Sequence, residues 1–204
     1  MKLALAVIAA VVSADVIDRV AVAVGFSVIT ESEILRQIRI TALLNGEQPD
    51  FSGPRKREAA ERLVEQMLIR REIETTRYAL DAKAESESLY VALRGRVGSE
   101  REWQNLLRQY RLQNSDVREA LQWQATLLEF IQVRFHPGVQ VSDEEIQQYY
   151  DDEVAKKPGA PSFDAARSDI EQVLTQQRVD RALDRWLGQT RTQNRIVFRE
   201  EVFR

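Results

Sequence analysis

The stretch Val16–Leu44, VIDRVAVAVGFSVITESEILRQIRITALL, decides the fold of this chain. Over Val20–Val24, valines alternate with small alanines, and this period of two is typical of a strand with one apolar face. Gly25-Phe26-Ser27 follows as a tight turn, and Val28-Ile29 resumes a short strand. The stretch therefore predicts a β-hairpin.

A helix is predicted to begin directly after the hairpin. Thr30 and Glu33 have the spacing of a capping box, in which the hydroxyl and the carboxylate each accept a hydrogen bond from a free backbone N–H. A two-stranded ribbon alone is only marginally stable in water. The rest of the chain must therefore supply a further strand or a layer of helices that covers the apolar face.

Helical spacing dominates the remainder of the chain. Pro54 stands at the start of one helix, and Ser99 with Glu102 and Ser142 with Glu145 are two further capping boxes. The apolar pattern predicts helices over Arg55–Tyr78, around Leu89 and Leu93, and over Ser99–Tyr110, Asp116–Phe135, Ser142–Tyr150 and Phe163–Thr192.

Two breaks and a final apolar segment complete the pattern. Asp81–Glu87 interrupts the helical spacing, and KKPGAP, residues Lys156–Pro161, is the strongest break and a natural hinge. A terminal strand is predicted from Ile196, Phe198, Val202 and Phe203. Because strands at the two ends of the chain each offer an unpaired edge, we expect them to pair. The predicted fold class is mainly α, a multi-helix body with a small β element formed by the N-terminal strands and the C-terminal strand.

Composition excludes several classes of function. The 204 residues carry a formal charge of −3 and a pI near 5.5, whereas a nucleic-acid-binding domain is usually basic. The chain has no cysteine, which removes disulfides, thiolate zinc sites and thiol nucleophiles. The sequence therefore predicts no nucleic-acid partner and no cofactor.

The first 14 residues resemble a secretory signal. Lys2 precedes the apolar run Leu3–Val12, and Val12-Ser13-Ala14 ends the run with small residues. Cleavage is predicted between Ala14 and Asp15. A buried strand at a true N-terminus is the alternative. A membrane span needs about 20 apolar residues, so this run is too short for one.

Three segments carry a resemblance to a known family. Asp18–Glu33, Arg62–Ile69 and Val141–Tyr150 resemble the SurA family of periplasmic chaperones. Gly25 stands where an asparagine is more usual in that family, and glycine tolerates the same turn. In the family the third segment precedes a parvulin-type prolyl isomerase domain. Here KKPGAP leads directly into the last long helix, so we expect that this domain is missing.

The resemblance implies an organisation and a function. It divides the chain into a signal (1–14), a SurA-like helical chaperone domain (15–157) and a C-terminal helix and strand (158–204) that complete the same body. It also implies a periplasmic, ATP-independent chaperone that holds unfolded or nascent secreted proteins, outer-membrane proteins among them. The alternatives are a scaffold or assembly subunit that binds one folded partner, and a prolyl isomerase by family label only.

No catalytic or metal site is predicted. His136, the single histidine, stands at a helix end beside Pro137, where a cation interacts favourably with the helix dipole. The acidic runs Asp143-Glu144-Glu145 and Asp151-Asp152-Glu153 also lie at helix ends, where solvation or the dipole explains them. Neither a GxSxG nucleophile turn nor a glycine-rich phosphate loop occurs. We therefore expect a non-catalytic protein.

Client binding is predicted at aromatic and leucine side chains in the helices, since large exposed apolar patches mark interaction sites. For each of these residues, packing in the core is the alternative. The KKPGAP hinge also leaves open a homodimer in which the C-terminal segment is exchanged between two copies. The candidate client-binding residues are Trp103, Leu107, Tyr110, Trp123, Phe130 and Trp186.

Overall fold

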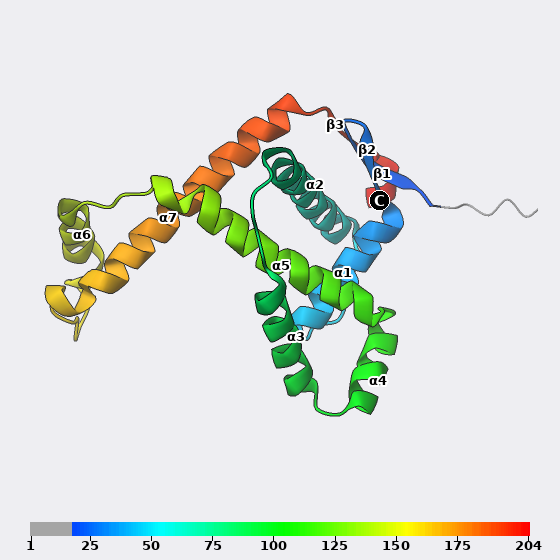
Figure 1. The fold of residues 1–204 in the computed structure, drawn as a ribbon, viewed down its shortest axis with the longest axis horizontal. Coiled ribbons are helices and arrows are strands. Elements are labelled where there is room, and N and C mark those ends of the chain that lie inside the picture. Colours follow the sequence, from blue (N-terminus) through cyan, green and yellow to red (C-terminus); the bar gives the residue numbers. More distant parts are fainter. Residues whose placement is uncertain (1–17) are drawn as a thin grey trace, which may run out of the picture.

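The predicted hairpin is present in the structure, a computed structural model that describes residues 18–204 (Figure 1). Strand β1 (Val20–Val24) pairs antiparallel with β2 (Ser27–Thr30). Gly25 in the turn has a φ of 59°, a left-handed conformation that glycine adopts without strain. The predicted signal, residues 1–14, and the cleavage point between Ala14 and Asp15 lie outside the described residues.

The expected multi-helix body follows the hairpin. In the described part of the chain, the helices are α1 (Glu31–Asn45), α2 (Gly53–Thr76), α3 (Lys83–Val97), α4 (Glu100–Tyr110), α5 (Asn114–Arg134), α6 (Asp143–Tyr149) and α7 (Phe163–Gln193). Three short turns accompany them: a 3₁₀ turn η1 (His136–Gly138), a π-helical turn η2 (Tyr150–Val154) and a 3₁₀ turn η3 (Glu200–Phe203). No helix within residues 18–204 has the length and apolar character that a membrane crossing requires.

All three predicted capping boxes form. The backbone N–H of Thr30 donates to Glu33 at 2.7 Å, and the same arrangement opens α4 at Ser99 and α6 at Ser142. The hydrogen bond from the backbone N–H of Ser99 holds the pKa of Glu102 below its usual value. The starts of these three helices are therefore set by local sequence, as expected.

Two local predictions were wrong. Residues 81–87 were expected to interrupt the helical pattern, but α3 already begins at Lys83, where the hydroxyl of Ser86 donates to the Lys83 carbonyl at 2.9 Å. Val202 and Phe203 were expected in the terminal strand. They lie in η3, and the buried Val202 and the partly buried Phe203 pack onto the core beneath the sheet.

The C-terminal strand closes the sheet, as predicted. Strand β3 (Ile196–Phe198) pairs antiparallel with β1, so that the strand order is β2-β1-β3. Two backbone hydrogen bonds of 2.8 Å bracket this pairing, from the N–H of Gly25 to the Arg195 carbonyl and from the N–H of Arg199 to the Ala21 carbonyl. The first and last described strands thus belong to one sheet.

Two separate apolar cores lie under the sheet and between the helices, and α1 belongs to both. Ile34 and Ile38 of α1 join β1, α2 and Val202 in the first core. Ile40 and Leu43, further along α1, join α3, α4 and α5 in the second core. Helix α1 is therefore the connection between the two cores.

Helix α7 runs from an outlying arm back to the sheet (Figure 1). Its first half packs with α6 around Ile146 and Ile170, apart from the two main cores. Its second half crosses the end of α5, where Trp186 contacts Phe130 at a centroid distance of 5.9 Å. Arg191 then pairs with Glu65 and Glu61 of α2, and α7 packs on its own chain here. The exchanged homodimer stays a prediction.

Removing the closing segment should destabilise the whole protein. Deletion of residues 196–204 takes away β3 and η3 and exposes the core face that Val202, Phe198 and Phe203 cover. At about 1.5–3 kcal/mol for each apolar side chain, we expect the melting temperature to fall by about 10 °C or more. Circular dichroism melting measures this, with deletion of Arg204 alone as the control. A melting temperature that matches the control would contradict the role of β3.

Adding a single methyl group at Gly53 should also destabilise the contact between α2 and η3. A Cβ added at Gly53 would overlap with the carbonyl oxygen of Phe203 and lie 3.1 Å from its carbonyl carbon, so η3 must move. We expect Gly53→Ala to cost about 1–3 kcal/mol in the free energy of unfolding.

The matched control is Gly188→Ala in α7, where a Cβ meets open space. Because alanine favours a helix over glycine, this variant should gain up to about 1 kcal/mol. Denaturant unfolding of both variants measures the difference. Equal changes in the free energy of unfolding at the two positions would show that the close contact between Gly53 and η3 does not contribute to stability.

Candidate functional site

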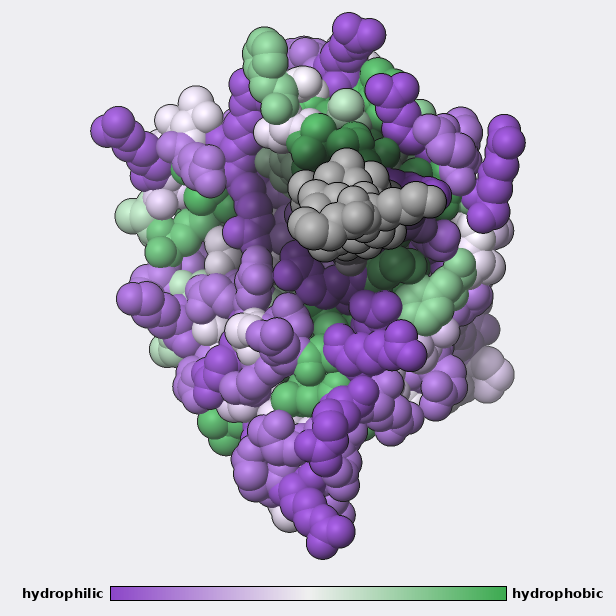
Figure 2. Space-filling view, turned by 90° about the vertical axis from the view of Figure 1, so that its right-hand side faces the viewer, coloured by the Kyte–Doolittle hydropathy of each residue, from purple (hydrophilic) through white to green (hydrophobic). Residues whose placement is uncertain are grey.

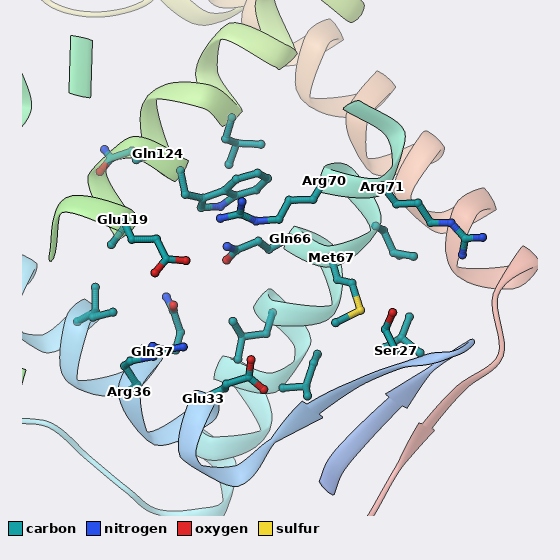
Figure 3. A pocket seen from close by; sticks show the side chains of 18 of the residues that line it. Ser27, Glu33, Arg36, Gln37, Gln66, Met67, Arg70, Arg71, Glu119 and Gln124 are labelled. Carbon is teal, nitrogen blue, oxygen red and sulfur yellow. The ribbon is translucent and has the colours of Figure 1, made fainter. Parts of the chain in front are cut away.

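A groove lies between the hairpin and helices α1, α2 and α5 (Figure 3). It encloses about 760 Å³ that water can enter, within the range of about 300–1,000 Å³ that is usual for binding pockets. The apolar part of its lining consists of Val24, Phe26, Ile29, Ile40, Leu44, Leu63, Met67, Leu68, Ala120, Trp123 and Leu127. A hollow of similar volume beside α6 is lined mainly by acidic and amide side chains, so the groove is the more apolar of the two.

Helical periodicity explains why each wall faces the groove. On α2, Leu63 and Met67 are four residues apart, and on α5, Trp123 and Leu127 have the same spacing, so each pair shares one face of its helix. On α2, Leu63 and Met67 also pack against the first core, and on α5, Ala120 of the lining packs against the second core. The groove is therefore the seam where the first core meets the second.

The hairpin forms one end of the groove. Ile29 is buried and Val28 points outward, since successive strand residues face opposite sides of a sheet. Ser27 lies beside Met67 in the close view (Figure 3). Phe26, at the tip of the turn, lines the mouth of the groove and is fully exposed to water.

Charged side chains of both signs surround the apolar floor. The guanidinium of Arg70 on α2 lies over the ring of Trp123 on α5, 4.5 Å from its centroid. Arg36 of α1 pairs with Asp116 of α5 at 3.5 Å, and Glu119 lies one turn beyond Asp116 on the same wall. These polar contacts bridge the seam while the apolar side chains below them stay partly exposed.

Side chains of several chemical kinds line the groove. Its lining offers apolar surface, amides and paired charges, and it contains neither histidine nor cysteine. His136 is exposed in η1, at the far end of α5, and is not part of the lining. Within residues 18–204, no three histidine, aspartate or glutamate side chains gather as a metal-binding group.

The structure separates the six predicted client-binding residues. Trp103, Leu107 and Tyr110 are buried in the second core, and Phe130 is buried between Tyr78, Phe135 and Trp186. For these four residues the structure shows the alternative, packing in the core, because each is enclosed by neighbouring helices. Trp186 is half-buried against α5, and Trp123 alone among the six lines the groove.

The sequence analysis missed most of the groove. The apolar spacing that predicts the helices over 55–78 and 116–135 does not indicate which helix face stays open, so Leu63, Met67 and Leu127 were not among the candidate residues. One local signal was available at Phe26, since an aromatic residue at the tip of a hairpin turn is exposed to water.

The two tryptophans provide a test of core against groove. Trp103 is buried, donates to Asn114 at 3.2 Å and packs edge-on against Tyr90. Trp103→Ala should therefore cost about 3–5 kcal/mol in the free energy of unfolding. Trp123→Ala should cost less than half as much, because one side of its ring faces the groove. Denaturant unfolding measures both, and equal losses would place Trp123 in the core.

Known proteins offer no relative of this chain in two comparisons. A scan against models of protein families finds no match for the chain, and a search of curated proteins finds none either. The resemblance of residues 18–33 to the SurA family therefore rests on the sequence pattern alone.

Proposed function

We propose that this chain is a non-catalytic, ATP-independent chaperone of the SurA type, which holds unfolded polypeptide segments in the groove. The observation that carries the proposal is an open groove with an apolar floor, walled by α1, α2 and α5. An unfolded protein exposes apolar side chains, and moving them from water onto such a floor is favourable by about 25 cal/mol per Å². Holding a client in this way needs no chemical step.

The size of the groove favours a short segment over a folded partner. About 760 Å³ accommodates a few side chains. A stable interface with a folded protein usually covers about 800 Å² on each partner and has a broad apolar centre. The lining of the groove is narrower, with charges close to its floor. This supports the chaperone over the scaffold subunit that is its main alternative.

The mixed charges at the rim support tolerance for many clients. Arg70 and Arg71 lie on the α2 wall, whereas Asp116 and Glu119 lie on the α5 wall. A rim of both signs has little preference for a client of one net charge, since attraction at one wall is offset at the other. Specificity then comes from apolar content, which is what distinguishes an unfolded chain from a folded one.

The proposal places the mature protein in the periplasm, with outer-membrane proteins as clients. The signal-like segment at residues 1–14 and the SurA-like block at residues 18–33 are its grounds. Release follows from simple dissociation, because the groove is open and the client regains its own contacts when it folds.

A pair of neighbouring leucines offers a matched test. Leu127 lines the groove, whereas Leu128, the next residue of α5, is exposed and lies outside it. Leu127→Glu places a charge on the apolar floor and should weaken the holding of an unfolded outer-membrane protein about tenfold or more, at about 1.4 kcal/mol for each factor of ten. Leu128→Glu should hold its client as the unchanged chain does.

Suppression of aggregation of the unfolded client, measured at increasing ratios of chain to client, gives the result. Circular dichroism melting of both variants checks that they are folded. No suppression by the unchanged chain at stoichiometric amounts would refute the proposal. If both variants lost the same amount of aggregation suppression, the groove would not be the client-binding site. Catalysis of proline-peptide isomerisation by the chain would refute the proposal that it is non-catalytic.

A further inference from the structure

Phe26 is an unusual residue at an unusual place. It occupies the second central position of a two-residue hairpin turn, after Gly25, and an aromatic residue at the tip of a turn has no neighbours that cover it. Its side chain is fully exposed, and two further apolar residues of the same hairpin, Val20 and Val28, are exposed by about half. Seen from the sheet end of the molecule, hydrophobic patches lie among hydrophilic residues (Figure 2). A fully exposed aromatic ring in a turn contributes nothing to this chain's own core.

The ring of Phe26 and the groove are on the same surface. Phe26 lines the mouth of the groove, so an apolar projection and an apolar hollow lie side by side. A surface that contains both a projection and a matching hollow can pair with its own copy, because in an isologous contact every interaction occurs twice. The groove floor offers the side chains that such a ring would contact, Met67 and Leu127 among them.

The charges of the two walls have the same self-complementary arrangement. The α2 wall carries Arg70, Arg71 and Glu74 and is positive on balance, whereas the α5 wall across the groove carries Glu119 and Asp116, the latter paired with Arg36 of α1. A two-fold rotation about an axis along the groove exchanges the two walls between copies. Each copy's arginines then face the other copy's carboxylates, and charges of opposite sign steer the two copies together.

We infer that two copies of this chain associate through the groove, with Phe26 of each copy entering the mouth of the other copy's groove. The α2 wall of each copy faces the α5 wall of its partner. This contact differs from an exchange of the C-terminal segment, because α7 and β3 stay on their own chain.

The dimer occupies the surface on which a client is held. Self-association therefore covers the apolar floor when no client is present, and an unfolded client competes with the second copy. This consequence for regulation rests on the proposed function, whereas the dimer itself does not. The apparent Kd for a labelled unfolded outer-membrane protein should rise as the chain concentration passes the Kd of the dimer.

Sedimentation equilibrium of the full chain tests the dimer. We expect the mass to double within a concentration range up to about 100 µM, which covers weak interfaces of standard size. Phe26→Asn retains a residue that suits the turn and should raise the Kd of the dimer at least tenfold. Val91→Asn, at an exposed position of α3 outside the groove, is the matched control and should leave the Kd unchanged.

Charge reversal tests the arrangement of the walls. Arg70→Glu alone places carboxylate against carboxylate, and Glu119→Arg alone places guanidinium against guanidinium, so each variant should be monomeric. An equimolar mixture of the two variants should dimerise, since each of the two contacts then joins opposite charges. Rescue in a mixture of separate chains arises only between molecules, which excludes a change within one chain.

Each outcome decides one point. A monomer over the whole concentration range overturns the inference and leaves the proposed function standing if Leu127→Glu still loses its client. If the chain dimerises but neither Phe26→Asn nor the charge-reversed variants change the Kd of the dimer, the inference is overturned. An exchange of C-terminal segments then becomes the better explanation of the dimer. A dimer that behaves as expected, in a chain that suppresses no aggregation, supports the inference and refutes the proposed function.

Discussion

The pairing of β1 with β3 is the interaction on which the rest of the structure depends. Strand β1 lies in the centre of the sheet and is bonded on one side to its hairpin partner and on the other to the last strand of the chain. A hairpin of this length leaves one edge of β1 open, and only β3 fills it. Since nearly all the described residues lie between the two strands, this closure fixes both ends of the helical body at once, at a substantial loop-closure cost in entropy.

The geometry of α7 follows from that constraint. The chain leaves the second core at the end of α5 and turns back through α6, and a straight helix must then return it to the sheet. At 1.5 Å per residue, the 31 residues of α7 span about 46 Å. Trp186 against Phe130 and Arg191 against Glu65 hold the helix where it passes α5 and α2, before β3 begins. The first half of the same helix packs against α6 and forms the outlying arm.

The sequence predicts those features of the fold that depend on residues close together in the chain, such as helix starts. The capping residues Thr30, Ser99 and Ser142 mark helix starts because a side chain three residues away completes each cap. The pairing of the terminal strands was also predicted, because two apolar edges at the chain ends needed partners. The error at Ser86 arose because its hydroxyl bonds to Lys83 and to Gln122 of α5, and that second contact is visible only in the folded chain.

The candidate site was much less predictable. Trp103 and Trp123 each lie on the apolar stripe of a helix, and their sequence surroundings do not separate them. Trp103 is enclosed because α3 brings Tyr90 against it, whereas Trp123 faces α2, which belongs to the other core. Exposure at a seam between two cores depends on how far apart the helices are held, and periodicity within one helix carries no information about that distance.

The seam stays open for a physical reason. Helix α1 packs into the first core through Ile34 and into the second through Leu43, so its length keeps the two cores side by side without merging them. Between α2 and α5, the contacts across the gap are polar, with Arg70 lying on Trp123. A guanidinium keeps part of its hydration while it covers an aromatic face, so this bridge costs less to open than an apolar contact of equal area. In water, the guanidinium covers part of the apolar floor. An apolar segment that covers more of the floor could displace it at low cost.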